Sequence, residues 1–172
     1  MNPEIAIAAA ILAVAATIDW KEHRVPNRLT IPAFVLGVGF HTFISGTSGL
    51  TGSLLGGAVG LGILIVPYAL SGMGAGDVKL MAAVGAWVGA GVTLHAFLWI
   101  AVLGGAMGVY SILRSGQAAA RMRLVLCAAK NLFTLQKLDT NVNRQAPPRI
   151  LLPYGVPIAL GFYAHFIFGG LI

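Results

Sequence analysis

Charged residues are scarce in this chain. Of its 172 residues only 9% are charged, whereas 58% are hydrophobic. A soluble domain of this length carries about a quarter charged residues, so this chain has too little polar surface to cover a globule in water. Long uncharged runs alternate with short basic segments, which is typical of helices that cross a bilayer. The composition therefore predicts an all-α, polytopic membrane helix bundle.

Cysteine is almost absent, because Cys127 is the single one. One cysteine excludes an internal disulfide and any zinc site built on paired cysteines. The histidines are scattered without metal-ligand spacing, and we expect them to form interhelical hydrogen bonds or to lie at the membrane boundary instead; they are His23, His41, His95 and His165. No serine or cysteine has the partner histidine of a nucleophilic catalyst. We therefore expect no metal and no cofactor.

The net charge of +6 comes from basic residues between the apolar runs, and residues 114–149 hold seven of the eleven Lys and Arg residues. This distribution indicates contact with anionic lipid headgroups, and no nucleic-acid-binding motif is present. Residues 114–149 are expected to form the main cytoplasmic loop. Arg123, Lys130 and Lys137 recur on one helical face, which predicts an amphipathic helix on the inner leaflet. A helix that docks the substrate is the alternative.

Apolar runs predict about six transmembrane helices in a single membrane-embedded domain, residues 1–172. Basic connections at 20–28 and 114–149 alternate with uncharged ones near 45–49 and 89–93, so the positive-inside bias predicts that both termini are periplasmic. The expected spans are 5–18, 29–44, 50–70, 77 to 89–91, 92–113 and 150–172. Small residues in the third span, including Gly56 and Gly60, predict close helix contacts, as do Gly104 and Gly108 in the fifth.

Two of the five acidic residues adjoin the spans. Asp19 ends the first span and Asp77 begins the fourth, so the predicted topology places both at the cytoplasmic boundary of the membrane. An ionisable group there is costly and usually faces a polar cavity or a partner. Two acids in a low-dielectric site tend to share one proton. The ionised member can then activate a water while the protonated one polarises a peptide carbonyl, as in aspartyl proteolysis.

Each acid taken alone also fits a role outside catalysis. An Asp at a helix start is favoured by the free N–H groups and the macrodipole, which suffices for Asp77. Asp19 alone fits a solvated charge that balances Lys21 or Arg24. Intramembrane acids also serve proton and ion pathways, so a small transporter is an alternative function. A transporter would favour acids at several depths or in two repeated halves, and neither is visible. A catalytically inactive scaffold of the same fold is the third alternative.

Three ordered motifs carry a family resemblance. Gly74-Ala75-Gly76-Asp77 forms G-x-G-D and is followed by Lys79, Asp19 precedes Val25-Pro26-Asn27, and Pro153-Tyr154-Gly155 opens the last span. From about residue 17 to 161 the chain resembles the type IV prepilin peptidases, which are membrane aspartyl proteases. The resemblance implies that Asp19 and Asp77 are the catalytic pair. It also implies cleavage of prepilin or pseudopilin leader peptides at the cytoplasmic face of the bacterial inner membrane.

The resemblance assigns further residues to the site. Gly74 and Gly76 would let the backbone approach the substrate or adopt positive φ. For Pro26, Asn27, Pro153 and Gly155, a turn or helix-start role stands beside a site-shaping role. Lys79, two residues beyond Asp77, is expected to point away from it and to snorkel towards lipid headgroups.

The chain departs from the larger family members in one respect. Those carry a cytoplasmic segment with two C-x-x-C pairs, which is linked to methylation of the new pilin N-terminus. Only a short basic linker joins the first two spans here, and one cysteine is present. The chain therefore resembles the short peptidases of tight-adherence (Flp-type) pilus systems, and we do not expect methyltransferase activity.

Overall fold

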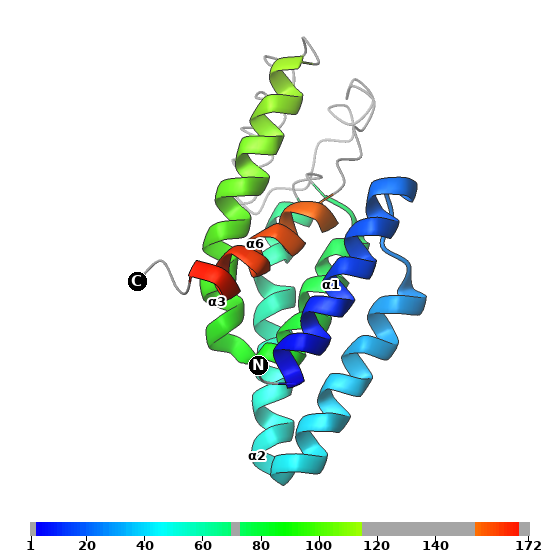
Figure 1. Cartoon of the computed structure of the whole chain (residues 1–172), viewed down its shortest axis with the longest axis vertical. Helices are drawn as coiled ribbons and strands as arrows, with labels where there is room; N and C mark the ends of the chain where they lie inside the picture. Colours follow the sequence, from blue (N-terminus) through cyan, green and yellow to red (C-terminus); the bar gives the residue numbers. More distant parts are fainter. Residues whose placement is uncertain (1–2, 70–72, 115–153, 169–172) are drawn as a thin grey trace, which may run out of the picture.

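Four helices make up the described part of a computed structural model, which covers residues 3–69, 73–114 and 154–168 (Figure 1). They are α1 (Pro3–Glu22), α2 (Asn27–Ala69), α3 (Ala75–Arg114) and α6 (Gly155–Phe168). Within those residues the structure is all helical. The helices α1 and α2 and the Ala75–Tyr110 part of α3 are each long and apolar enough to cross a membrane. The predicted class, an all-α membrane protein, is confirmed.

Single glycines interrupt the two longest helices. In α2 the backbone at Gly46 has φ 59°, and in α3 Gly89 has φ 82°. These values lie in the left-handed region that residues with a Cβ resist. Figure 1 shows α2 descending and then rising again from the bottom of the view. Each glycine lies in a segment predicted as an uncharged connection, but the helices continue on both sides of it. The reversal in α2 therefore needs one special residue rather than a loop at 45–49.

Close contact between α2 and α3 depends on small residues. A Cβ atom added to Gly56 would overlap the Gly85 carbonyl oxygen, and one added to Gly60 would overlap that of Met81. Without side chains at these positions the two backbones touch directly, which is the usual role of small-residue pairs in membrane helices. The helix contact predicted at Gly56 and Gly60 is confirmed.

Side chains make hydrogen bonds to backbone carbonyl groups at and just before the break at Gly89. Ser53 Oγ donates to the Ala86 carbonyl at 2.7 Å, and His41 Nε2 lies 2.9 Å from the Trp87 carbonyl oxygen. Thr93 Oγ1 donates to the Gly89 carbonyl at 2.7 Å. Unpaired carbonyls are expensive away from water, so these contacts stabilise the bend. His41 thus makes the interhelical contact expected of the histidines.

The helix α6 crosses the bundle obliquely and contacts both α1 and α3 (Figure 1). Phe162 and Ile158 of α6 are fully buried in the core with Leu12 of α1 and Leu80 of α3. Tyr163 Oη donates to the Ala9 carbonyl at 2.7 Å, which ties α6 to α1. The predicted last span, 150–172, is longer than the described helix, because 150–153 and 169–172 lie outside the described residues. The predicted amphipathic helix within 114–149 also lies outside them.

The ring of Tyr154, just before α6, packs against the second predicted pair of small residues, Gly104 and Gly108. Its ring lies 3.5 Å from the point where a Cβ atom on Gly104 would stand, and its hydroxyl lies 3.7 Å from the equivalent point on Gly108. Gly104 and Gly108 therefore form the shallow surface of α3 against which the aromatic ring rests. This contact fixes the place where the chain enters α6.

Candidate active site

Asp19 occupies the last turn of α1. The predicted first span stopped at residue 18, but the helix runs to Glu22, and Asp19 is 2% exposed. His23 ends the helix with φ 52°, and its backbone N–H donates to the Asp19 carbonyl at 2.8 Å. A left-handed residue after the last turn is a common helix terminus. The carboxyl group is thus carried by a regular helix and faces the interior of the bundle.

Asp77 is held by the N-terminus of its own helix. The sequence predicted a span that starts at Asp77, but α3 begins at Ala75, which makes Asp77 its third residue. Gly74 N–H donates to Asp77 Oδ2 at 3.1 Å, and Asp77 N–H donates to the Gly74 carbonyl at 3.2 Å. The bond to Oδ2 is half of a capping box, the half in which the side chain of the third helical residue satisfies the N–H of the residue before the helix; Gly74 has no side chain to supply the other half. Asp77 is 5% exposed.

A cavity of about 280 Å³ joins the two acids. It is lined by residues of two segments, one around the end of α1 and one around the start of α3: Asp19, His23, Arg24, Val25, Gly74, Ala75, Gly76 and Asp77. The two carboxyl groups are within electrostatic reach of each other. Asp77 Oδ1 is buried and has no hydrogen-bond partner among the described residues. The structure therefore brings together the acids that the topology argument paired.

The two glycines before Asp77 have different surroundings. A Cβ atom on Gly76 would stand 2.6 Å from the Val25 carbonyl oxygen, so Gly76 is needed where α3 meets the α1–α2 connection. On Gly74 it would stand 3.3 Å from Asp77 Oδ2. Positive φ was one expectation for both, and it is wrong, because among the described glycines only Gly46 and Gly89 have positive φ. The close backbone contact of Gly76 is with this chain's own Val25.

Pro26 and Asn27 start α2 next to the cavity. The Pro26 carbonyl accepts the backbone N–H of Leu29 at 3.0 Å, so Pro26 has the helix-start role that the sequence allowed. Asn27 Oδ1 accepts a hydrogen bond from Lys79 Nζ at 3.0 Å. Lys79 was expected to snorkel towards lipid headgroups; in the structure its ammonium group also contacts the side-chain amide of the first residue of α2, in an exposed hydrogen bond. Its ammonium group thus has a protein partner.

Gly155 reaches the site from the far end of the sequence. Its backbone N–H donates to Asp19 Oδ2 at 2.7 Å, and the bond is buried. Pro153, the other residue predicted there, lies outside the described residues. Sequence reasoning missed Arg24 and Val25 as cavity residues. Their position directly after Asp19 was the available signal, since a helix end and the turn after it share one neighbourhood.

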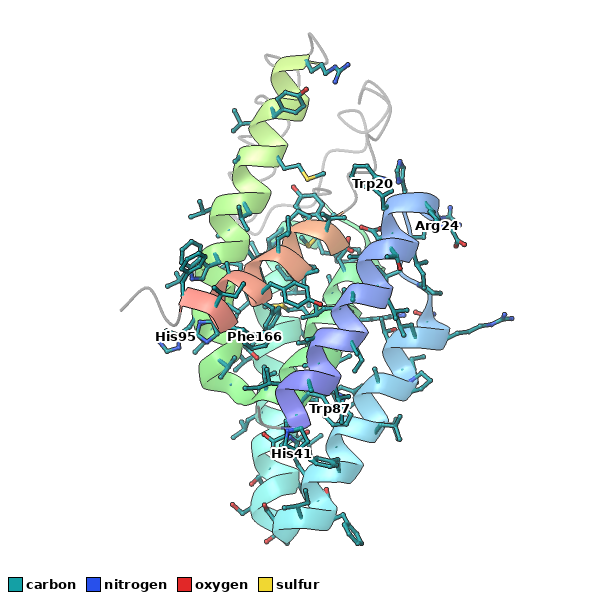
Figure 2. The ribbon with its side chains drawn as sticks, in the orientation of Figure 1. Trp20, Arg24, His41, Trp87, His95 and Phe166 are labelled. Atoms are coloured by element: carbon teal, nitrogen blue, oxygen red, sulfur yellow. The ribbon has the colours of Figure 1, made fainter. Side chains whose placement is uncertain are left out.

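Figure 2 shows which end of the bundle carries the site. Trp20 and Arg24 lie at the upper end of α1, whereas His41 and Trp87 lie towards the opposite end. Trp20 is 67% exposed, as expected of an aromatic anchor at a membrane interface. Trp87 is buried and donates from Nε1 to the Ala33 carbonyl at 2.8 Å, so it serves packing. In the described part of the chain no group of three or more potential metal-ligating side chains is clustered.

The fold and the cavity define a helical membrane protein with two buried carboxyl groups at one end of its bundle. The chain belongs to the type IV leader peptidase family, whose model matches residues 6–109. Both aspartates and the glycines before Asp77 lie within the matched region. Gly155 lies beyond it.

A curated relative supports the same family. The chain is 37% identical over 97 residues to the prepilin leader peptidase/N-methyltransferase of Escherichia coli (strain K12). The match covers 52% of this chain, and the chain spans 42% of the length of that relative. No solved structure matches the chain.

Proposed function

We propose that this protein is an aspartic endopeptidase that removes the leader peptides of prepilins or pseudopilins. The observation that carries the proposal is the placement of Asp19 and Asp77, both buried, on one cavity. Membership of the type IV leader peptidase family supports the reaction, and the E. coli relative supports the substrate class. The alternatives, a proton pathway or an inactive scaffold, have no comparable support.

The chemistry needs only water and the two carboxyl groups. Two acids on one low-dielectric cavity tend to share one proton, because both cannot ionise easily there. The ionised member takes a proton from a water, which attacks the scissile carbonyl carbon, while the protonated member donates a hydrogen bond to the carbonyl oxygen. Asp77 Oδ1, which has no other partner among the described residues, is available to hold that proton or to accept from the water. Transfer of a proton to the amide nitrogen then breaks the C–N bond, which releases the leader peptide with a carboxyl end and the pilin with a new N-terminal amine.

The proposed topology follows the two limbs of each long helix. With α2 and α3 each crossing twice, α1 and α6 complete six spans, and both termini are periplasmic. The site then faces the cytoplasm from the bacterial inner membrane. Lys21, Arg24 and Arg28, beside the cavity end of α1, fit an inner leaflet with anionic headgroups.

Substitution of each acid tests the function. Asp19→Asn and Asp77→Asn keep the size of the side chain and remove the charge, so each should abolish leader cleavage. The assay co-expresses the membrane protein with a prepilin and follows the mobility shift of the pilin on a gel. Glu22→Gln is the matched control, because Glu22 is an exposed acid of the same helix as Asp19 and should be dispensable. Full processing by either Asp variant, inserted at wild-type levels, contradicts the proposal.

A further inference from the structure

Among the described residues, neither Tyr154 nor the first turn of α6 supplies a side chain that caps the N-terminus of α6. The Ile158 N–H donates to the Tyr154 carbonyl at 3.1 Å, so Tyr154 is the residue before the helix and Gly155 is its first residue. An aromatic ring offers no acceptor to the helix, and the ring of Tyr154 rests on α3 instead. The first N–H groups of a helix lack intrahelical partners, and a buried helix end needs acceptors from elsewhere. The helix α6 must therefore obtain an acceptor from another element.

Asp19 supplies that acceptor across the bundle. The 2.7 Å bond from Gly155 N–H to Asp19 Oδ2 is buried and joins residues 136 positions apart. A carboxylate at a helix N-terminus is also favoured by the macrodipole. Hydrogen bonds to ionised groups are short and stronger than neutral ones, and this distance fits that class. The last turn of α1 and the first turn of α6 are thus held together by the side chain proposed for catalysis.

Only glycine fits at position 155. A Cβ atom there would stand 2.9 Å from Asp19 Oδ2, 3.0 Å from its Cβ and 3.1 Å from its Cγ. All three contacts are with one short side chain whose own backbone is fixed in α1. Any side chain at 155 must therefore displace the Asp19 carboxyl group, move α6, or both.

We propose that Gly155 is the positioning residue of Asp19: its N–H fixes the carboxyl group, and its lack of a side chain leaves room for that group. The inference rests on the proposed peptidase function. Asp77 is held by Gly74, the residue directly before its own helix, so its geometry is local. Asp19 depends on α6, and its place in the pair is set by tertiary packing. Gly155 acts through Asp19 and need not touch the substrate.

The test compares two substitutions at one position. Gly155→Ala adds a Cβ atom and keeps the N–H, whereas Gly155→Pro adds a Cβ atom and removes the N–H. Proline suits the first position of a helix, and the restriction that it places on the preceding residue suits a residue outside the helix. The proline Cδ atom also stands where the N–H pointed at Asp19 Oδ2, so the difference between the variants reports loss of the hydrogen bond together with displacement of the acceptor oxygen. Gly105→Ala is the matched control, because a Cβ atom on Gly105 meets nothing within 4 Å.

Kinetics of the purified full chain in detergent use a peptide that spans the leader junction of a prepilin. A misplaced catalytic group lowers kcat by about 100-fold, and we expect this for Gly155→Ala with KM nearly unchanged. Gly155→Pro should be slower by at least a further tenfold or so, because it loses one hydrogen bond to a charged group and its ring displaces the acceptor oxygen. Gly105→Ala should retain wild-type kcat. A wild-type kcat in Gly155→Ala, equal kcat in the two variants, or a rise in KM alone overturns the proposal.

A second measurement does not depend on cleavage. A carbodiimide modifies accessible protonated carboxyl groups, and mass spectrometry reads the modification of Asp19 with the exposed Glu22 as the internal reference. Loss of the N–H donor should raise the labelling of Asp19 by about tenfold in Gly155→Pro, and the labelling of Asp77 should fall, because the two acids share one proton. Unchanged labelling of Asp19 contradicts the role of Gly155. A wild-type chain that leaves the prepilin peptide uncut contradicts the proposed function instead, so the two failures are distinguishable.

Discussion

Lys79 Nζ donates a hydrogen bond to Asn27 Oδ1 at 3.0 Å, and this contact joins the fifth residue of α3 to the first residue of α2. Beside it, Gly76 rests on the backbone of Val25. The chain from Val25 to Asn27 therefore contacts the start of α3 at two adjacent points. Since Asp19 precedes this segment and Asp77 lies in the first turn of α3, the two contacts act together with the Gly155 hydrogen bond to set the relative position of the acids.

Asn27→Ala should remove the hydrogen bond between α2 and the start of α3 and lower kcat by about two- to fivefold. The bond is exposed, so it contributes less than a buried hydrogen bond to a charged group. Lys79→Ala should have a similar effect, and the double variant should be no worse than either single one, because both remove the same contact. Steady-state cleavage rates of the three variants check this. Fully additive losses would show that Asn27 and Lys79 act independently.

Gly76→Ala should impair cleavage far more than Asn27→Ala. The new Cβ atom would stand 2.6 Å from the Val25 carbonyl oxygen, which is backbone and cannot rotate away. The first turn of α3 must then shift, and a displacement of about 1 Å at a catalytic group can cost 100-fold in rate. Gly62→Ala, where a Cβ atom meets nothing within 4 Å, is the control for cleavage and for thermal unfolding. Equal rates in the two variants would contradict the close contact.

Gly56→Ala should destabilise the fold by about 1–3 kcal/mol, the usual cost of overpacking. Its Cβ atom would overlap the Gly85 carbonyl oxygen, and the two helices must separate to admit it. Gly52→Ala, one turn earlier on α2, meets nothing within 4 Å and should be neutral or slightly stabilising, because alanine favours the helix. Thermal unfolding in detergent measures both. A Gly56→Ala melting temperature at or above that of Gly52→Ala would contradict the close contact between α2 and α3 at Gly56.

His41→Ala should also lower the free energy of unfolding, by about 1–2 kcal/mol. The imidazole pairs with the Trp87 carbonyl next to the break at Gly89, and its loss leaves that carbonyl without a side-chain partner. His95→Ala is the matched control, because His95 is exposed and its Nδ1 lies 2.9 Å from the carbonyl of Gly91 in its own helix. Equal changes in melting temperature for the two variants would show that the His41 contact has no special role.

Local features of the sequence predicted much of the fold. Apolar runs located the helices, and glycine-containing uncharged segments located the interruptions at Gly46 and Gly89. Charge alternation placed Asp19 and Asp77 at one end of the bundle, where the cavity joins them. These successes have one cause, since each property depends on residues that are neighbours along the chain.

Contacts between distant segments were not predictable in the same way. The partner of Lys79 lies 52 residues away, and the donor to Asp19 lies 136 residues away. A sequence pattern marked Asn27 and Gly155 as site residues but could not say which atoms they contact. The helix start was misplaced by two residues for a local reason: a glycine-rich segment signals a loop, although Ala75 and Gly76 are already helical.

Gly46, the residue of α2 with a left-handed backbone conformation, affects the choice of experiments that measure membrane orientation. At Gly46 the chain changes direction while both flanking limbs stay helical, so that end of α2 offers no spare length of chain. An epitope or reporter inserted there would have to unwind a helix. A protease added from that side would find no extended segment of chain to bind in its active-site groove. Membrane sidedness is better measured with single cysteines introduced at exposed positions of the predicted connection 45–49, such as Ser48. The native Cys127 would first be replaced by serine, so that one thiol at a time is labelled.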